Sequence, residues 1–163
     1  MVVINIAVTL LLISLITYYY NEQLFREKSK ISIKESLDLL EIPVITLENN
    51  NKKFNFILDT GSSHSHISPT AAKDLQYNRK GRINYSANSA NGTITNDCKV
   101  LDVDLKYKKD IFNINLIITE NLELSFRDIM DSSKIQLHGI IGSDFLAKHK
   151  YILDFANKVA YHK

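Results

Sequence analysis

The sequence contains little cysteine and no large excess of charge of either sign. Cys98 is the only cysteine among 163 residues, so no disulfide bond can form within the chain. The formal net charge at pH 7 is +2, which indicates neither a strongly basic surface nor an acidic tail. We therefore expect no nucleic-acid partner. A chain without disulfides can function on either side of a membrane, so cysteine usage leaves the compartment open.

Charged side chains are also absent from residues 2–20. As a helix this span would measure about 28 Å, close to the thickness of the hydrocarbon layer of a bilayer. Tyr18, Tyr19 and Tyr20 stand where the aromatic residues of a transmembrane helix meet the interface. The sequence therefore predicts a single-pass membrane anchor over residues 1–20. A cleaved signal peptide is the alternative, but no basic residue precedes the apolar run and no small-residue cleavage pattern follows it.

The nearby basic residues all follow the apolar run: Arg26, Lys28, Lys30 and Lys34. The positive-inside rule therefore favours a domain on the cytoplasmic side of the membrane. Residues 21–36 are polar, with mixed charge and few apolar positions. We predict that they form a juxtamembrane linker and that a single globular domain covers residues 37–163.

Residues 54–63 combine a strand pattern with a polar turn. Large apolar residues at every second position of 54–58 are typical of a strand with one buried face. The strand leads directly into Asp59-Thr60-Gly61-Ser62, which places a carboxylate at the end of a packed strand. Gly61 allows a tight turn, and the hydroxyls of Thr60 and Ser62 could hydrogen-bond the carboxylate. By itself this pattern is also typical of an ordinary strand-terminating turn.

Further strands and turns surround this loop. Ile42, Val44 and Ile45 predict a preceding strand, which the turn Asn49-Asn50-Asn51 would join to 54–58 as a hairpin. Ser68-Pro69 is typical of the start of a short helix.

The rest of the chain predicts one flexible hairpin and several regular elements. Residues 81–95 are rich in Asn, Ser, Ala and Gly, and Asn91-Gly92 is a hairpin-turn signal, so we expect an exposed, mobile hairpin. Alternating apolar residues predict strands near 101–105 and 112–118. A short helix or loop is expected over 121–134. Ile140-Ile141-Gly142 then follows a short apolar strand and precedes a short helix and a terminal hairpin.

These parts resemble the retropepsin-like aspartic proteases, in particular their bacterial membrane-anchored members. Members of that superfamily have a similar order of elements along the chain. A strand enters Asp-Thr-Gly and is followed by a flap hairpin that contains glycine, by further strands, and by two apolar residues with a glycine before a short helix. The resemblance covers residues 40–161. It implies a mostly β fold, a single-domain closed β-barrel with a flap hairpin and one or two short helices.

The resemblance also implies an activity and a set of site residues. It implies an aspartic endopeptidase with Asp59 as catalytic acid, acting on a peptide or protein substrate without a cofactor or metal. The remaining roles are support of the catalytic loop by Thr60, Gly61 and Ser62, substrate binding by the flap residues Ser89, Ala90, Asn91 and Gly92, and packing against the loop by Ile140, Ile141 and Gly142. Only one Asp-Thr-Gly is present, so the second carboxylate would come from another copy of the chain in a symmetric homodimer.

Other candidate residues have simpler interpretations. His64 and His66 could suggest a metal pair, but we expect exposed loop histidines because no further ligands accompany them. Asp144 and Asp154 lack the Asp-Thr-Gly context, and Asp144 suits the first turn of a helix. The alternative to a protease is a catalytically silent module of the same fold that binds extended peptides or a partner protein at the membrane. An intact Asp59 favours the enzyme.

Overall fold

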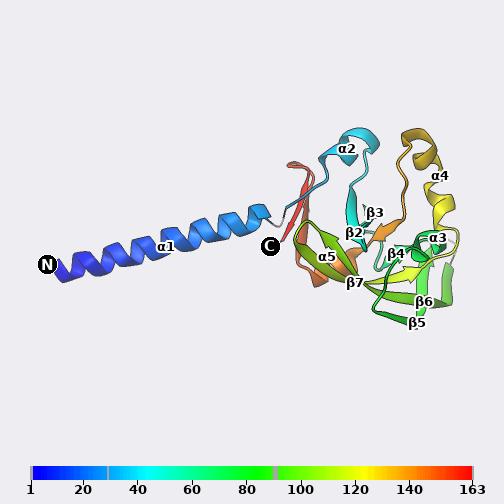
Figure 1. The fold of residues 1–163 in the computed structure, drawn as a ribbon, viewed down its shortest axis with the longest axis horizontal. Coiled ribbons are helices and arrows are strands. Elements are labelled where there is room, and N and C mark those ends of the chain that lie inside the picture. Colours follow the sequence, from blue (N-terminus) through cyan, green and yellow to red (C-terminus); the bar gives the residue numbers. More distant parts are fainter. Residues whose placement is uncertain (1, 29, 90–91, 163) are drawn as a thin grey trace.

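The computed structural model describes residues 2–28, 30–89 and 92–162. In this part of the chain, six strands close into a barrel around the main hydrophobic core (Figure 1). Their spatial order is β2 (Val44–Asn49), β3 (Lys52–Leu58), β8 (Gly139–Ile141), β4 (Ser65–Ile67), β7 (Asp110–Ile118) and β6 (Gly92–Tyr107). Pairing of Glu48 with Lys106 joins β6 back to β2 and closes the barrel. The predicted mostly β, closed-barrel fold is confirmed.

The β2–β3 hairpin follows directly from the local sequence. Ile45 and Leu47 on β2 and the apolar side chains at positions 54, 56 and 58 on β3 are buried, as their alternation predicts. Asn50 and Asn51 form the turn with φ values of 48° and 63°, a left-handed conformation that asparagine adopts more readily than most residues.

A second hairpin, called the outer hairpin below, pairs β5 (Arg79–Ser89) with β6 from Arg79↔Asp102 to Ser89↔Gly92. The sequence predicts this hairpin but not the length of its regular strands. Residues 79–84 are all exposed, so the apolar alternation that marks a half-buried strand is missing from this arm. Ala90 and Asn91, the middle of the predicted flap, lie outside the described residues.

The packed domain begins earlier than the sequence predicts, at Ile31 instead of Leu37. Strand β1 (Ile31–Ser32) pairs with β10 (Val159–His162), which pairs in turn with β9 (Tyr151–Asp154). Ile31 and Ile33 are each only 1% exposed, and helix α2 (Lys34–Leu40) follows them. Two buried isoleucines in a polar segment are too short a pattern to predict a strand whose partner lies at the other end of the chain.

Four further helices complete the fold. Helix α1 (Val2–Lys28) projects away from the barrel (Figure 1). Helix α4 (Leu122–Ser133) packs Leu122 and Phe126 into a smaller second core. Helix α3 (Pro69–Ala72) has the predicted cap, in which Oγ of Ser68 accepts a hydrogen bond from the Ala71 N–H. Helix α5 (Ser143–Lys148) starts directly after β8. Among the residues that the structure describes, no helix is both long and apolar enough to cross a membrane.

Candidate active site

Asp59 lies at the end of β3, where two strands from distant parts of the sequence run side by side. Leu58 is paired in parallel with Ile141 of β8, and the Asp59 N–H donates a 3.0 Å hydrogen bond to the Ile141 carbonyl oxygen. Leu58 and Ile141 are buried, whereas Asp59 is half-buried. The packed strands therefore hold the backbone of Asp59, while the residue as a whole stays partly exposed.

The turn after Asp59 positions the carboxylate itself. The Gly61 N–H donates a 2.8 Å hydrogen bond to Oδ1 of Asp59, and the Ser62 N–H donates to the Asp59 carbonyl oxygen at 3.2 Å. A Cβ atom at Gly61 would lie 3.1 Å from Oδ1, which is a tight contact. Thr60 and Gly61 are exposed. The Ser62 hydroxyl, expected near the carboxylate, donates instead to the His64 carbonyl oxygen at 2.7 Å.

The start of α5 packs against this turn. The N–H and the hydroxyl of Ser143 both donate to the Ser62 carbonyl oxygen, at 2.8 and 3.0 Å. Gly142 fits here because a Cβ atom would lie 2.4 Å from the His64 carbonyl oxygen. The segment 140–142 thus lies against the Asp59 loop, through backbone contacts that leave no room for a larger residue at 142.

Asp144 and Ser65 form a second link that the sequence does not reveal. The Asp144 carboxylate accepts hydrogen bonds from the Ser65 hydroxyl at 2.7 Å, the Ser65 N–H at 3.1 Å and the Phe145 N–H at 2.8 Å. The Ser65 hydroxyl accepts in turn from the Gly142 N–H at 3.0 Å. Asp144 does lie in the first turn of α5 as predicted. A buried serine after an Asp-Thr-Gly turn has no distinctive sequence pattern, so Ser65 could not be singled out.

The histidines near the loop are held by burial and by contacts within the fold. His66 is 7% exposed, not the exposed loop residue that was predicted, and its Nδ1 lies 2.8 Å from Oγ1 of Thr119. Burial lowers its pKa, and the nearby His64 adds to this effect. Nδ1 of His138 accepts a 2.9 Å hydrogen bond from the Asn55 N–H. The described residues contain no group of three or more side chains that could hold a metal ion.

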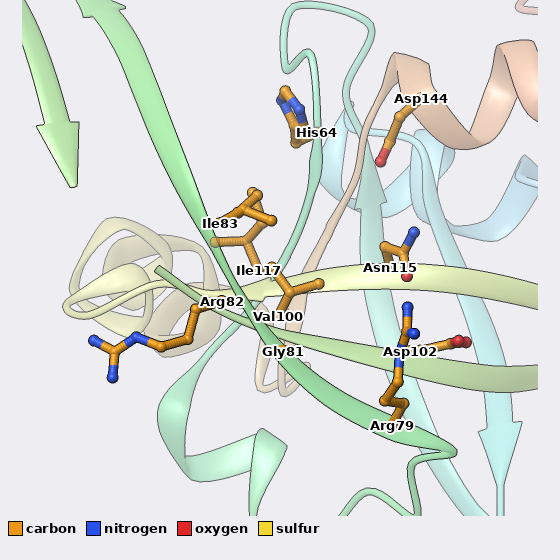
Figure 2. A pocket seen from close by; sticks show the side chains of 10 residues that line it. All are labelled: His64, Arg79, Gly81, Arg82, Ile83, Val100, Asp102, Asn115, Ile117 and Asp144. Atoms are coloured by element: carbon orange, nitrogen blue, oxygen red, sulfur yellow. The ribbon is translucent and has the colours of Figure 1, made fainter. Parts of the chain in front are cut away.

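A pocket of about 400 Å³ lies beside the loop, between α5, β7 and the outer hairpin (Figure 2). Three apolar side chains, Ile83, Val100 and Ile117, form its wall. The other lining residues are polar or glycine: His64, Arg79, Gly81, Arg82, Asp102, Asn115 and Asp144. The sequence gives no sign of this pocket, because its residues come from five separate segments of the chain.

Comparison with known proteins found a family model and solved structures that are similar to this chain. The family model described as "Aspartyl protease" matches residues 45–145. The structure of EIAV protease complexed with the inhibitor HBY-793 is 20% identical, covers 68% of this chain and 90% of that chain, and has a TM-score of 0.46. A retropepsin-like aspartic protease from Rickettsia conorii is 18% identical, covers 81% of this chain and 87% of that chain, and has a TM-score of 0.49. No curated protein matches the sequence significantly.

Proposed function

Because this chain belongs to the aspartyl protease family, we propose that it is an aspartic endopeptidase that acts as a homodimer, with one Asp59 from each copy. The proposal is supported mainly by the way Asp59 is held and by its partial exposure. Its backbone is held by Ile141 and its Oδ1 by the Gly61 N–H, yet the residue is only half-buried and its neighbours Thr60 and Gly61 are exposed. A positioned carboxylate at an open surface suits a site that a second copy completes.

The chemistry requires two carboxylates close together. At a separation of about 3 Å, two carboxyl groups cannot both be ionised, so they share one proton. The ionised partner then accepts a proton from the attacking water, and the protonated partner donates a hydrogen bond to the oxygen of the scissile carbonyl. Proton transfer to the amide nitrogen then lets the C–N bond of the tetrahedral intermediate break, which releases an amine and a carboxylic acid. In this scheme Gly61 lets the two loops approach, and the flap residues 89–92 predicted from the sequence cover the bound peptide.

Cleavage of a mixed peptide library by the full-length chain, from pH 4 to 7, tests the proposal. Asp59→Asn removes the reacting carboxylate, and Asp131→Asn on the exposed face of α4 is a matched control for the same chemical change. We expect wild type and Asp131→Asn to cut the same bonds and Asp59→Asn to cut none. Equal cutting by Asp59→Asn would contradict the mechanism. No cutting by a chain that sedimentation shows to be dimeric would favour the silent peptide-binding module instead.

Attachment to a membrane through residues 1–20, with the domain on the cytoplasmic side, stays a prediction of the sequence. The side chains of Leu10, Leu11 and Ile16 on α1 are more than 60% exposed, and burial in lipid would remove that apolar surface from water. Membrane attachment is tested by fractionating cells that express the full-length chain and then extracting the membranes with carbonate. An anchored chain stays in the membrane pellet, and a chain released by carbonate is not anchored.

A further inference from the structure

We propose that the pocket beside the Asp59 loop is a specificity subsite for an acidic side chain of the substrate, and that Arg79 binds its carboxylate. This inference rests on the proposed function, because it assigns the pocket to a peptide that reaches Asp59. It adds a preference for substrates that contain glutamate, which nothing in the catalytic loop itself determines.

The pocket is continuous with the catalytic loop. His64, at one end of the pocket, ends the loop that starts at Asp59, and its carbonyl oxygen accepts the Ser62 hydroxyl. Asp144, at the same end (Figure 2), lies two residues after Gly142, where the segment that packs against the Asp59 loop ends. The pKa of His66 is affected by the charges of three nearby residues, His64, Asp144 and Asp59. A side chain of an extended peptide bound at Asp59 could therefore enter this pocket.

The middle of the pocket suits an aliphatic stem. Ile83 and Val100 come from the outer hairpin, and Ile117 comes from β7. Ile117 is 2% exposed whereas Ile83 is 37% exposed, so the apolar wall runs from the barrel core to the surface. Methylene groups that lie along this wall would leave water, and a polar tip would then reach the far end of the pocket.

Both carboxylates that line the pocket already have donors from the protein. Three hydrogen bonds from Ser65 and Phe145 satisfy Asp144. Oδ1 of Asp102 accepts from the side-chain amide of Asn113. A carboxylate that already accepts hydrogen bonds from the protein repels an incoming anion less than a carboxylate without such bonds. It also attracts a cation less strongly.

The two arginines of the pocket differ in their partners. Arg82 forms an ion pair with Asp97, with N–O distances of 2.6 and 2.8 Å, and its side chain points away from the pocket in Figure 2. Arg79 has no hydrogen-bond or ion-pair partner within the described part of the chain, and it rises from β5 toward Asn115. Arg79 is therefore a cation without a bound anion at the far end of an apolar wall. A planar guanidinium can bind a carboxylate with two parallel hydrogen bonds.

Binding to the catalytically inactive full-length chain tests the subsite separately from proteolysis. A random decapeptide library is passed over immobilised Asp59→Asn chain, and the retained peptides are sequenced. We expect glutamate to be enriched about fivefold over glutamine, the effect of one partly exposed charged pair. The second substitution Arg79→Gln should abolish the enrichment, and Arg79→Glu should replace it with enrichment of lysine. Lys80→Gln, which removes the same charge from the opposite face of β5, should leave it unchanged.

Three results would overturn the subsite: retention without a preference for glutamate, no retention of any peptide, or a preference that survives Arg79→Gln. The thermal melting of each variant is measured alongside, and the exposed position of Arg79 predicts little change. Cleavage of the same library by the wild type reports on the proposed function alone. A chain that selects glutamate through Arg79 but cuts nothing would keep the subsite and reject the protease.

Discussion

The hydroxyl of Ser65 joins the two halves of the candidate site: it donates to Oδ1 of Asp144 at 2.7 Å and accepts from the Gly142 N–H at 3.0 Å. Ser65 belongs to the strand that follows the Asp59 loop, and Asp144 belongs to the helix that follows β8. Ser65 is completely buried, so water cannot replace these bonds. The Ser65 side chain therefore adds a buried link to the backbone hydrogen bonds that join the loop carrying the carboxylate to the segment that packs against it.

Replacement of Ser65 by alanine should destabilise the domain. The change leaves the Gly142 N–H without its acceptor and Asp144 without one of its donors, at an expected cost of about 1–3 kcal/mol. Urea unfolding followed by circular dichroism measures this free energy. Ser63→Ala, in the exposed part of the same loop, is the control and should change stability by less than about 0.5 kcal/mol. Equal stability of the two variants would show that the buried hydrogen bonds contribute little.

Gly139 should not tolerate a side chain. A Cβ atom there would lie 2.2 Å from the His66 carbonyl oxygen and 2.9 Å from the Phe56 ring. Gly139→Ala should therefore force β3, β4 and β8 apart and cost about 1–3 kcal/mol or more. Gly81→Ala is the matched control, because a Cβ atom at that position meets nothing within 4 Å. Thermal melting compares the two, and an unchanged melting temperature for Gly139→Ala would contradict the packing seen at β8.

Ile33 should prove to be part of the core although it lies in the predicted linker. Its side chain is 1% exposed, and Ile33→Ala should destabilise the full-length chain by about 2–5 kcal/mol. Ser32→Ala, on the exposed residue beside it, should have little effect. Urea unfolding of the full-length variants measures both changes. If Ile33→Ala unfolds like the wild type, β1 does not belong to the cooperative domain.

Stability should fall as the pH decreases below about 6.5. Burial lowers the pKa of His66, His138 and His149 from 6.5, so the native state keeps these imidazoles neutral where the unfolded chain protonates them. The unfolded state then binds more protons, and the free energy of unfolding decreases by at most about 1.4 kcal/mol per pH unit for each histidine. Carboxylates with a lowered pKa, such as Asp104, change the free energy of unfolding only at more acidic pH.

Urea unfolding at pH 7.5, 6.0 and 5.0 measures this dependence. The variant His66→Asn has no imidazole at the most buried of these positions, so its free energy of unfolding should change less between pH 7.5 and 5.0 than that of the wild type. A wild-type free energy that is constant over this range would show that the three histidines titrate alike in the folded and unfolded states.

The local features of this protein can be predicted from its amino-acid sequence alone. Alternation from Phe54 to Leu58, the turn at Asn50 and Asn51, and the cap at Ser68 were all predicted and all found. Each depends on interactions between residues a few positions apart, which a sequence displays directly. The motif Asp59-Thr60-Gly61 with Ile140-Ile141-Gly142 likewise predicted the family that the family model identified.

Contacts between residues that are distant in the chain become visible in the folded protein and could not be predicted. Asn49 illustrates this: its buried side chain donates to the carbonyl oxygens of Gln76 and Asp104 and accepts from the Gln76 N–H. The burial of Ile31, the link from Ser65 to Asp144 and the position of Arg79 in the pocket are of the same kind. In each case the partner lies far away in the chain. Folding excludes water from these positions, so a buried polar group must then find its hydrogen-bond partner within the protein.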